Sequence, residues 1–201
     1  MEEIVTNPGL QHIIQNAPTN NGKTPIYVAA FNGHLNIVKA LMTSTSNPNT
    51  PDNNGETPIF AAAMNGYLSI VTELMTVVDN PNGPSNVNGL TPIFIAAQNG
   101  HVDIVKSLMT KSENPNAPAN NGMTPINEAA LKGYIEIVKV LMTSTDNPLA
   151  PANNGSTPID AARHNGHLEI VEVLKAKRPK LTKSEMHWKR WKKLKGIKAQ
   201  L

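Results

Sequence analysis

The chain has no cysteine and few aromatic residues: two Trp, three Tyr and three Phe among 201 residues. Without thiols it can form neither disulfides nor thiolate metal sites, which favours a reducing compartment. No apolar run approaches the length that crosses a membrane, and the start Met1-Glu2-Glu3 lacks the profile of a signal peptide. We therefore expect a cytoplasmic protein, with the nucleus as the alternative, and a core of aliphatic side chains and alanine.

Basic residues are scarce over most of the chain and concentrated at its end. Residues 1–174 carry 7 basic and 14 acidic side chains, whereas residues 175–201 carry 11 basic and 1 acidic side chain. The net charge of +3 thus combines an acidic body with a basic tail. Overall basicity is therefore no argument for nucleic-acid binding by most of this molecule.

The motif Asn-Gly-x-Thr-Pro-Ile occurs five times, at spacings of 33 or 34 residues. Two further features recur in phase with it: a glycine followed by His or Tyr, and an Ile-Val-x-x-Leu segment. A fixed period in this range indicates a solenoid, in which each unit is too small to bury its apolar side alone. The motif begins at Asn21, Asn54, Asn88, Asn121 and Asn154.

The first copy illustrates the local structure that each unit encodes. Thr24 is a favourable N-cap and Pro25 suits the first helical position, so a short helix should begin there and stop at Gly33. A second helix should run from about Leu35 to Met42. Its inward-facing side chains should be Ile37, Val38, Leu41 and Met42. The Pro- and Asn-rich segment that follows forbids a helix and favours an extended, hairpin-like turn.

These units resemble the ankyrin repeat over residues 20–178. The family pattern Gly-x-Thr-Pro-Leu-His-x-Ala-Ala, Gly-His and Ile-Val-x-x-Leu-Leu is matched by residues 22–30, 33–34 and 37–42. The resemblance implies an all-α ankyrin-repeat solenoid of five helix-turn-helix repeats with hairpin-like turns and capping helices at both ends. The expected boundaries are 1–19 for the N-terminal cap, 20–51, 52–84, 85–118, 119–151 and 152–178 for the repeats, and 179–201 for a basic C-terminal helix.

Two positions depart from the family pattern. The histidine after Thr-Pro-Leu is replaced in every copy, and the glycine that ends the second helix is replaced by Thr45, Val78, Ser112 and Thr145. The second helix must therefore be capped in a different way. The 34-residue spacing adds one residue near Ser85–Val87, which predicts a bulged turn before the third repeat.

Positions that vary among the copies cluster on the turn and on one side of the first helix. Ankyrin repeats line a concave groove with these elements, so the resemblance implies that the varied side chains contact a partner. We predict a non-enzymatic scaffold that binds another folded protein as a monomer, with no small-molecule substrate, cofactor or metal. The predicted contact residues are Lys23, Tyr27, Phe31, Glu56, Phe60, Met64, Leu90, Phe94, Gln98, Met123, Asn127, Leu131, Ser156 and His164. A further varied position holds Val28, Ala61, Ile95, Glu128 and Ala161.

Many of these side chains are apolar, and together they would exceed the apolar surface that a monomer normally exposes. Aromatic and Met-rich patches are also where the binding energy of interfaces concentrates. The alternative is that some of them only pack between repeats. This alternative applies more to Tyr27, Phe60 and Phe94 than to the set Phe31, Met64 and Leu131.

Residue patterns typical of an active site are missing. There is no Ser/His/Asp nucleophile arrangement and no phosphate-binding glycine loop, because the glycines mark the repeats. His34, His101 and His167 recur at one framework position, which favours structural packing over metal binding.

The basic tail supports several interpretations. Thr182–Glu185 has the pattern of a capping box, which predicts a helix to about Gly196 with Trp188, Trp191 and Leu194 on one side. That side could seal the fifth repeat. Alternatives for residues 177–198 are a nuclear-import signal around Lys177–Lys180, or binding of nucleic acid, an anionic membrane or a partner with a helix-binding groove of calmodulin type.

The first residues and the origin of the chain also leave alternatives open. Residues 8–14 should form a short helix that seals the first repeat, and their weak similarity to an F-box segment suggests a substrate adaptor of a ubiquitin ligase. The near-copies at residues 117–122 and 150–155 fit an engineered, library-selected binder. The single inserted residue in the third repeat fits a natural gene instead.

Overall fold

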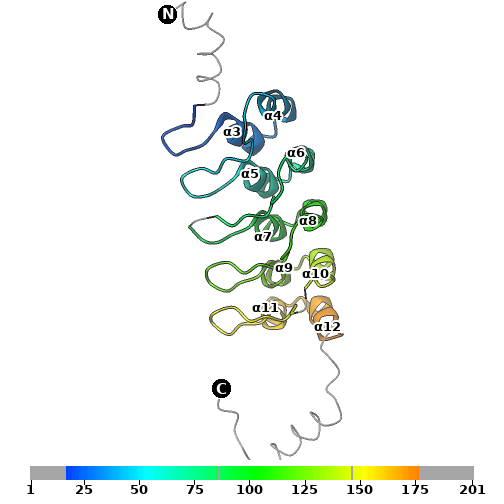
Figure 1. Cartoon of the computed structure of the whole chain (residues 1–201). Coiled ribbons are helices and arrows are strands. Elements are labelled where there is room, and N and C mark those ends of the chain that lie inside the picture. The colour runs from blue at the N-terminus through cyan, green and yellow to red at the C-terminus, as the bar shows by residue number, and fades with distance from the viewer. Residues whose placement is uncertain (1–16, 86, 146, 177–201) are drawn as a thin grey trace, which may run out of the picture.

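The computed structural model describes residues 17–85, 87–145 and 147–176. In this part of the chain, helices stack in two layers, and long loops project beside the first layer (Figure 1). The first layer comprises α3 (Pro25–Phe31), α5 (Pro58–Asn65), α7 (Pro92–Gln98), α9 (Pro125–Lys132) and α11 (Pro158–His164). The second comprises α4 (Leu35–Met42), α6 (Leu68–Leu74), α8 (Val102–Met109), α10 (Ile135–Leu141) and α12 (Leu168–Ala176). The predicted helical solenoid is confirmed, since each helix contacts its counterpart in the next repeat.

Each first-layer helix begins where the sequence predicts. The threonine before it has extended backbone angles, and its hydroxyl accepts a hydrogen bond from the amide three residues later, at 3.1–3.3 Å. Proline occupies the first helical position in all five helices. In α9 and α11, Asn127 and Asp160 also accept a hydrogen bond from the backbone amide of the capping threonine. These caps satisfy amides that a helix start would otherwise leave unpaired.

The glycine after each first-layer helix does two things. Gly33 and Gly66 have φ angles of +79° and +82°, a left-handed conformation that ends the helix at low cost. They also leave room for an aromatic ring of the next repeat. A Cβ atom at Gly33 would lie 2.7 Å from the ring of Tyr67, and one at Gly66 would lie 2.8 Å from the ring of His101. The glycines therefore set the spacing between neighbouring repeats.

The core is a continuous ladder of aliphatic side chains and alanine. The fully buried side chains include Ile59, Ile70, Leu74, Ile93, Ile104, Leu108, Ile126, Ile137 and Leu141. One expectation was wrong: Ile37 does not face inward but is 49% exposed, while its equivalents in later repeats are buried. The reason is its place in the stack: α4 packs on α3 and α6, and no helix of the described residues precedes this repeat.

The projecting loops, which we call fingers, are hairpin-like turns as expected. In the second finger, the Asp52 amide donates to the Glu56 carbonyl, and Gly55 donates back to Asp52. Neighbouring fingers are joined in turn, for example by the Asn53 amide donating to the Asn21 carbonyl. In the third finger the closing bond runs from Ser85 to Leu90, which spans one residue more than in the others. The predicted bulge is thereby confirmed.

The second-layer helices end without the family's glycine, and the structure shows what replaces it. A threonine hydroxyl donates to the carbonyl three residues earlier, at 2.7–2.8 Å, in four repeats. At the end of α6, the Lys111 ammonium of the next repeat also donates to the Met75 carbonyl at 2.6 Å. The expectation of a different cap is confirmed. Residues 1–16 and 177–201, with the two predicted end helices, lie outside the described part of the chain.

Candidate functional site

The predicted contact residues form three rows that cross the repeats. The turn row follows each finger glycine, the inner row lies in the first turn of each first-layer helix, and the outer row lies one helical turn later. The turn row is Lys23, Glu56, Leu90, Met123 and Ser156. The inner row is Tyr27, Phe60, Phe94 and Asn127, and its position in the fifth repeat holds Asp160, which was not a predicted contact. The outer row is Phe31, Met64, Gln98, Leu131 and His164. These rows are separated in sequence, so only the packing of repeats shows which side chains meet.

The inner row is largely buried, which differs from the predicted contact surface. Tyr27, Phe60, Phe94 and Asn127 are 2–4% exposed, whereas Asp160 at the same position of the fifth repeat is exposed. Tyr27 bonds Glu56 of the next repeat through its hydroxyl, and Phe60 belongs to the hydrophobic core. Asn127 instead bonds the amide and hydroxyl of Thr124. These four side chains therefore serve the core of the free protein.

The turn row and the outer row remain at the surface. Phe31 is 42% exposed and His164 is exposed, while Met64, Gln98 and Leu131 are partly buried. Every member of the turn row is partly exposed. The two rows border a surface along the fingers and first-layer helices that we call the groove, and it is hollowed between the third and fourth and between the fourth and fifth repeats. Of the predicted residues, these ten are exposed or partly exposed, whereas the four of the inner row are buried.

At the first repeat, charged and aromatic side chains of the groove lie against one another. The Lys23 ammonium lies 4.8 Å from the centre of the Tyr27 ring, and the Phe31 ring stacks on Tyr27 at 6.4 Å between centroids. The Tyr27 hydroxyl donates to Glu56 at 2.9 Å across the repeat boundary. Burial, this hydrogen bond and the charges of Glu56 and Asp52 raise the pKa of Tyr27 well above its usual value. Tyr27 thus remains uncharged and links the first and second repeats through this hydrogen bond.

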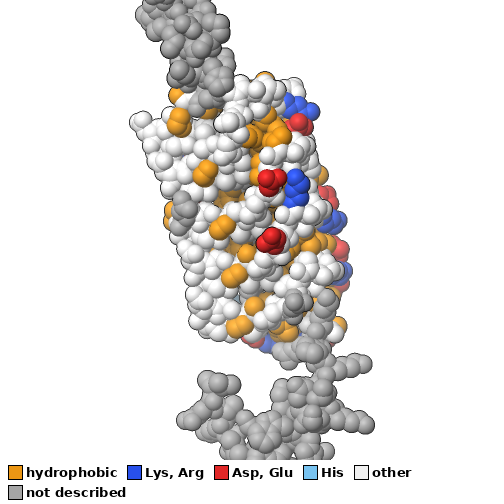
Figure 2. All heavy atoms as spheres, in the orientation of Figure 1, with side chains coloured by type: hydrophobic (Ala, Val, Ile, Leu, Met, Phe, Trp, Pro, Cys, Tyr) orange, Lys and Arg blue, Asp and Glu red, His pale blue; other side chains and the backbone are white. Residues whose placement is uncertain are grey.

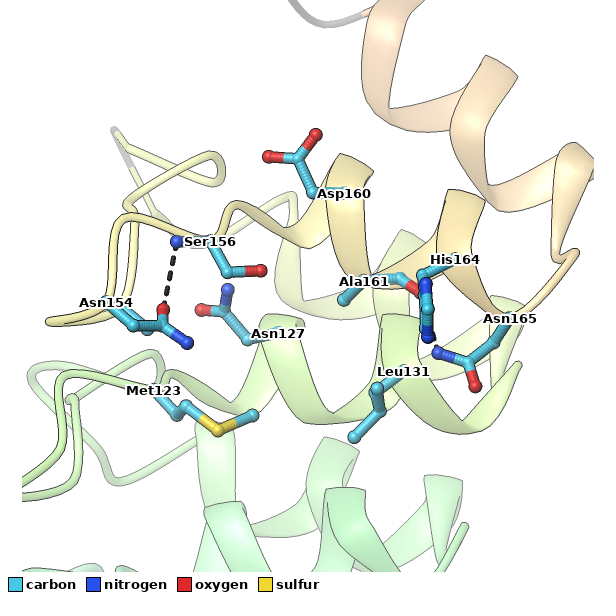
Figure 3. Close-up of a pocket in the computed structure, with 10 residues that line it drawn as sticks. Met123, Asn127, Leu131, Asn154, Ser156, Asp160, Ala161, His164 and Asn165 are labelled. Atoms are coloured by element: carbon cyan, nitrogen blue, oxygen red, sulfur yellow. Dashed lines mark hydrogen bonds between the residues drawn. The ribbon is translucent and has the colours of Figure 1, made fainter.

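A cavity of about 490 Å³ opens between the fourth and fifth repeats. Figure 3 shows Met123 and Leu131 of the fourth repeat beside Ala161 and His164 of the fifth. Ala161, which lines this cavity, stands where repeat three has the larger Ile95. Its remaining lining comes from Asn127, Ala152, Asn154, Ser156, Asp160 and Asn165. A partly apolar hollow of this size suits a side chain of a bound protein.

The recurring histidines have structural roles at two positions. The Nε2 atom of His101 lies 3.3 Å from the Met64 carbonyl oxygen, and that of His167 lies 3.2 Å from the Leu131 carbonyl oxygen. Their rings also rest on Gly66 and Gly133 of the preceding repeat. These contacts confirm the predicted packing role. In the described ranges, no group of three or more His, Cys, Asp or Glu residues is placed to hold a metal ion.

Sequence comparison of the repeats missed part of the site. Glu128, Asn154, Ala161 and Asn165 line the cavities of the groove but were not among the predicted contact residues. Variation among copies at the position of Glu128 and Ala161 was the available signal.

None of the helices in the described part of the chain is long and apolar enough to cross a membrane.

Figure 2 shows how charge is distributed on one face of this stack. The Lys, Arg, Asp and Glu side chains in view lie toward the second-layer helices, and the area over the fingers shows only hydrophobic and uncharged side chains. The finger tips carry Asn-Gly pairs that are used in the bonds between fingers. On the face in view, the area over the fingers therefore carries little charge.

Stacked helix pairs, linked fingers and a groove of variable side chains define a repeat protein built to present an extended surface. Models of the family described as ankyrin repeats, three copies, match residues 5–82, 76–151 and 120–185. The chain belongs to the ankyrin-repeat family. Ankyrin repeats are in general protein–protein interaction modules and typically act as non-enzymatic scaffolds. A search of curated proteins found no match to this chain.

Proposed function

We propose that this protein binds a folded partner protein through the groove bordered by its turn row and outer row. The observation that carries the proposal is the apolar series of the outer row: Phe31 is exposed, Met64 and Leu131 are partly exposed, and all three vary among repeats whose framework does not. Apolar side chains that reach the surface in a row are typical of interaction surfaces.

The proposal assigns the partner a convex or extended surface that spans several repeats. The buried inner row gives the groove a rigid floor, because Tyr27 and Phe94 are held by packing and by helix caps. A rigid surface loses little conformational entropy on binding. We place this activity in the cytoplasm, with the nucleus as the alternative, and we propose that the protein acts as a monomer and without catalysis.

The test is a triple variant, Phe31→Ser, Met64→Ser and Leu131→Ser, compared with the wild-type full chain. Each protein is immobilised, and the proteins that it retains from a cell extract are quantified by mass spectrometry. The triple variant should lose specifically retained partners while circular dichroism shows an unchanged helix content. Retention of the same partners at the same level would refute the groove assignment.

The matched control places three serines on exposed apolar positions outside the two rows. Leu68, Val77 and Leu168 are exposed in the second layer, by 37%, 57% and 68%. Their replacement removes a similar kind of surface and should leave the retained partners unchanged. If this control variant also loses them, the effect is one of general surface hydrophobicity and not of the groove.

The basic tail carries the alternative functions, namely binding of nucleic acid, a membrane or an import receptor, and its net positive charge is the observation that favours them. Removal of residues 180–201 separates the two proposals. A truncated chain that keeps its partners supports the groove, whereas a truncated chain that loses them assigns binding to the tail. Adaptor activity in a ubiquitin ligase and an engineered origin remain predictions from the sequence alone.

A further inference from the structure

Glu128 is charged, whereas the residues at the equivalent position of the other repeats are apolar. It lies in the first turn of α9 and is 5% exposed, although its equivalents in the other copies are the apolar residues Val28, Ala61, Ile95 and Ala161. The framework therefore accepts an aliphatic side chain at this point. Its Oε1 atom accepts a hydrogen bond from Gln98, and neither of its oxygens is both buried and unpaired, so the carboxylate keeps access to the surface. The fold alone does not account for this residue.

The pairing of Glu128 is incomplete. The Gln98 side-chain amide donates to its Oε1 atom at 3.3 Å, which is a long hydrogen bond. Lys132 is four residues later on the same helix and exposed, yet among the described residues the ion pairs within 4.0 Å involve other carboxylates. The start of α9 gives partial compensation through the helix dipole. The carboxylate is therefore accessible and has no cationic partner within 4.0 Å among the described residues.

This carboxylate lines an open cavity of about 380 Å³ between the third and fourth repeats. The walls of the cavity are apolar at Leu90, Phe94 and Met123 and carry amides at Gln98 and Asn121. An aliphatic chain could lie along the apolar walls and end at the carboxylate. Arginine and lysine have this combination of an apolar stem and a charged head.

We propose that Glu128 is the anchor for an arginine or lysine side chain of the partner protein. The inference rests on the proposed groove function and adds the chemistry of one contact to it. Charge complementarity identifies the occupant, since the cavity offers one incompletely paired carboxylate and no cation among the residues that line it. The neighbouring cavity shares Met123 with this one and would take an adjacent apolar side chain of the same partner.

The inference can be tested with a small probe, before any partner is identified. Nα-acetyl-arginine N-methylamide is titrated into the full-length protein, and the NMR signals of the Gln98 side-chain amide and the Glu128 carboxyl carbon are followed. The citrulline analogue has the same shape without the charge. We expect saturable shifts with the arginine probe and about tenfold weaker binding of the citrulline probe, because a charge-assisted pair is lost.

Three variants complete the test. Glu128→Gln should abolish the preference for the arginine probe, and Glu136→Gln, an exposed carboxylate of α10 that pairs with Lys139, should leave it unchanged. Glu128→Ile introduces the residue of repeat three and should fold with stability at least equal to the wild type. Equal binding of the two probes, absence of saturable shifts, or a preference that survives in Glu128→Gln would each overturn the inference.

This inference and the proposed function can fail separately. A partner that is lost by the triple serine variant but binds Glu128→Gln as well as the wild type would overturn the role of Glu128 and leave the groove assignment standing. A partner retained by both variants would refute both.

Discussion

The side-chain oxygen of Asn82 accepts a 2.9 Å hydrogen bond from the backbone amide of Ile93, eleven residues later in the chain. Asn49 and Asn116 make the same bond to Ile59 and Ile126. Each bond ties the segment that leaves one repeat to the first turn of the next helix. The loops between repeats are thereby held by buried polar contacts as well as by apolar packing.

Replacement of Asn82 by alanine should lower the free energy of unfolding by about 1–3 kcal/mol, because the buried amide of Ile93 loses its partner. Urea unfolding followed by circular dichroism measures this loss. Asn36→Ala, at an exposed position of α4, serves as the control and should change stability by less than about 0.5 kcal/mol. Equal losses for the two variants would contradict the role of the Asn82 bond.

Alanine at Gly133 and at Gly166 should destabilise the protein unequally. Both glycines have positive φ angles, +84° and +75°, so each variant incurs a backbone cost of about 1–2 kcal/mol. At Gly133 the new Cβ would also lie 2.6 Å from the ring of His167, whereas at Gly166 it meets no atom within 4 Å. Displacement of His167 should add about 1 kcal/mol at Gly133. Thermal unfolding compares the pair, and similar losses would show that the ring contact contributes little.

The stability of the protein should depend on pH through Asp160. Hydrogen bonds from the hydroxyl and amide of Thr157, and the nearby charge of Arg163, lower the pKa of this carboxyl group. A carboxyl with a lower pKa in the folded state stabilises the fold above the unfolded-state pKa of about 3.9, and this contribution is lost as pH falls through the folded-state value.

Asp160→Asn tests this dependence, since Asn127 already closes the same capping box in α9. Between about pH 5 and pH 2 the wild type should lose more stability than the variant, as measured by urea unfolding at each pH. Parallel curves for the two proteins would show that the lowered pKa has no consequence for folding.

Lys111→Met should destabilise the junction between the second and third repeats. Its ammonium donates to the carbonyls of Met75 and Val78 beyond the end of α6, and Val77 there lacks the hydroxyl that Ser44 supplies in the first repeat. The free energy of unfolding should fall by only about 0.5–1 kcal/mol, because the contact is partly exposed to solvent.

Lys106→Met is the matched control for this prediction. Lys106 makes only a surface ion pair with Asp103, three residues earlier on α8. Replacement of Lys106 should lower the free energy of unfolding in urea less than replacement of Lys111 does. If the control is equally destabilised, a general loss of positive charge explains both results.

Features that repeat with the period of the sequence could be predicted from the sequence alone. The threonine caps, the proline at the first helical position, the glycine stops and the extra residue of the third finger all depend on neighbours within a few residues. The same residue types recur at these positions, so the same caps and turns can be predicted in every copy. Ile37 was predicted wrongly because its burial depends on its place in the stack, which the repeat pattern does not encode.

Tertiary structure decided which of the variable residues are at the surface. Tyr27 and Phe31 are four residues apart on one side of α3, and sequence variation treats them alike, yet the first is 2% exposed and the second 42%. Tyr27 bonds Glu56 of the next repeat, whereas Phe31 is the last residue of α3 and stays at the surface. The incompletely paired carboxylate of Glu128 depends in the same way on residues brought together from two repeats. Periodicity and capping thus determine the solenoid, while contacts between repeats determine its binding surface.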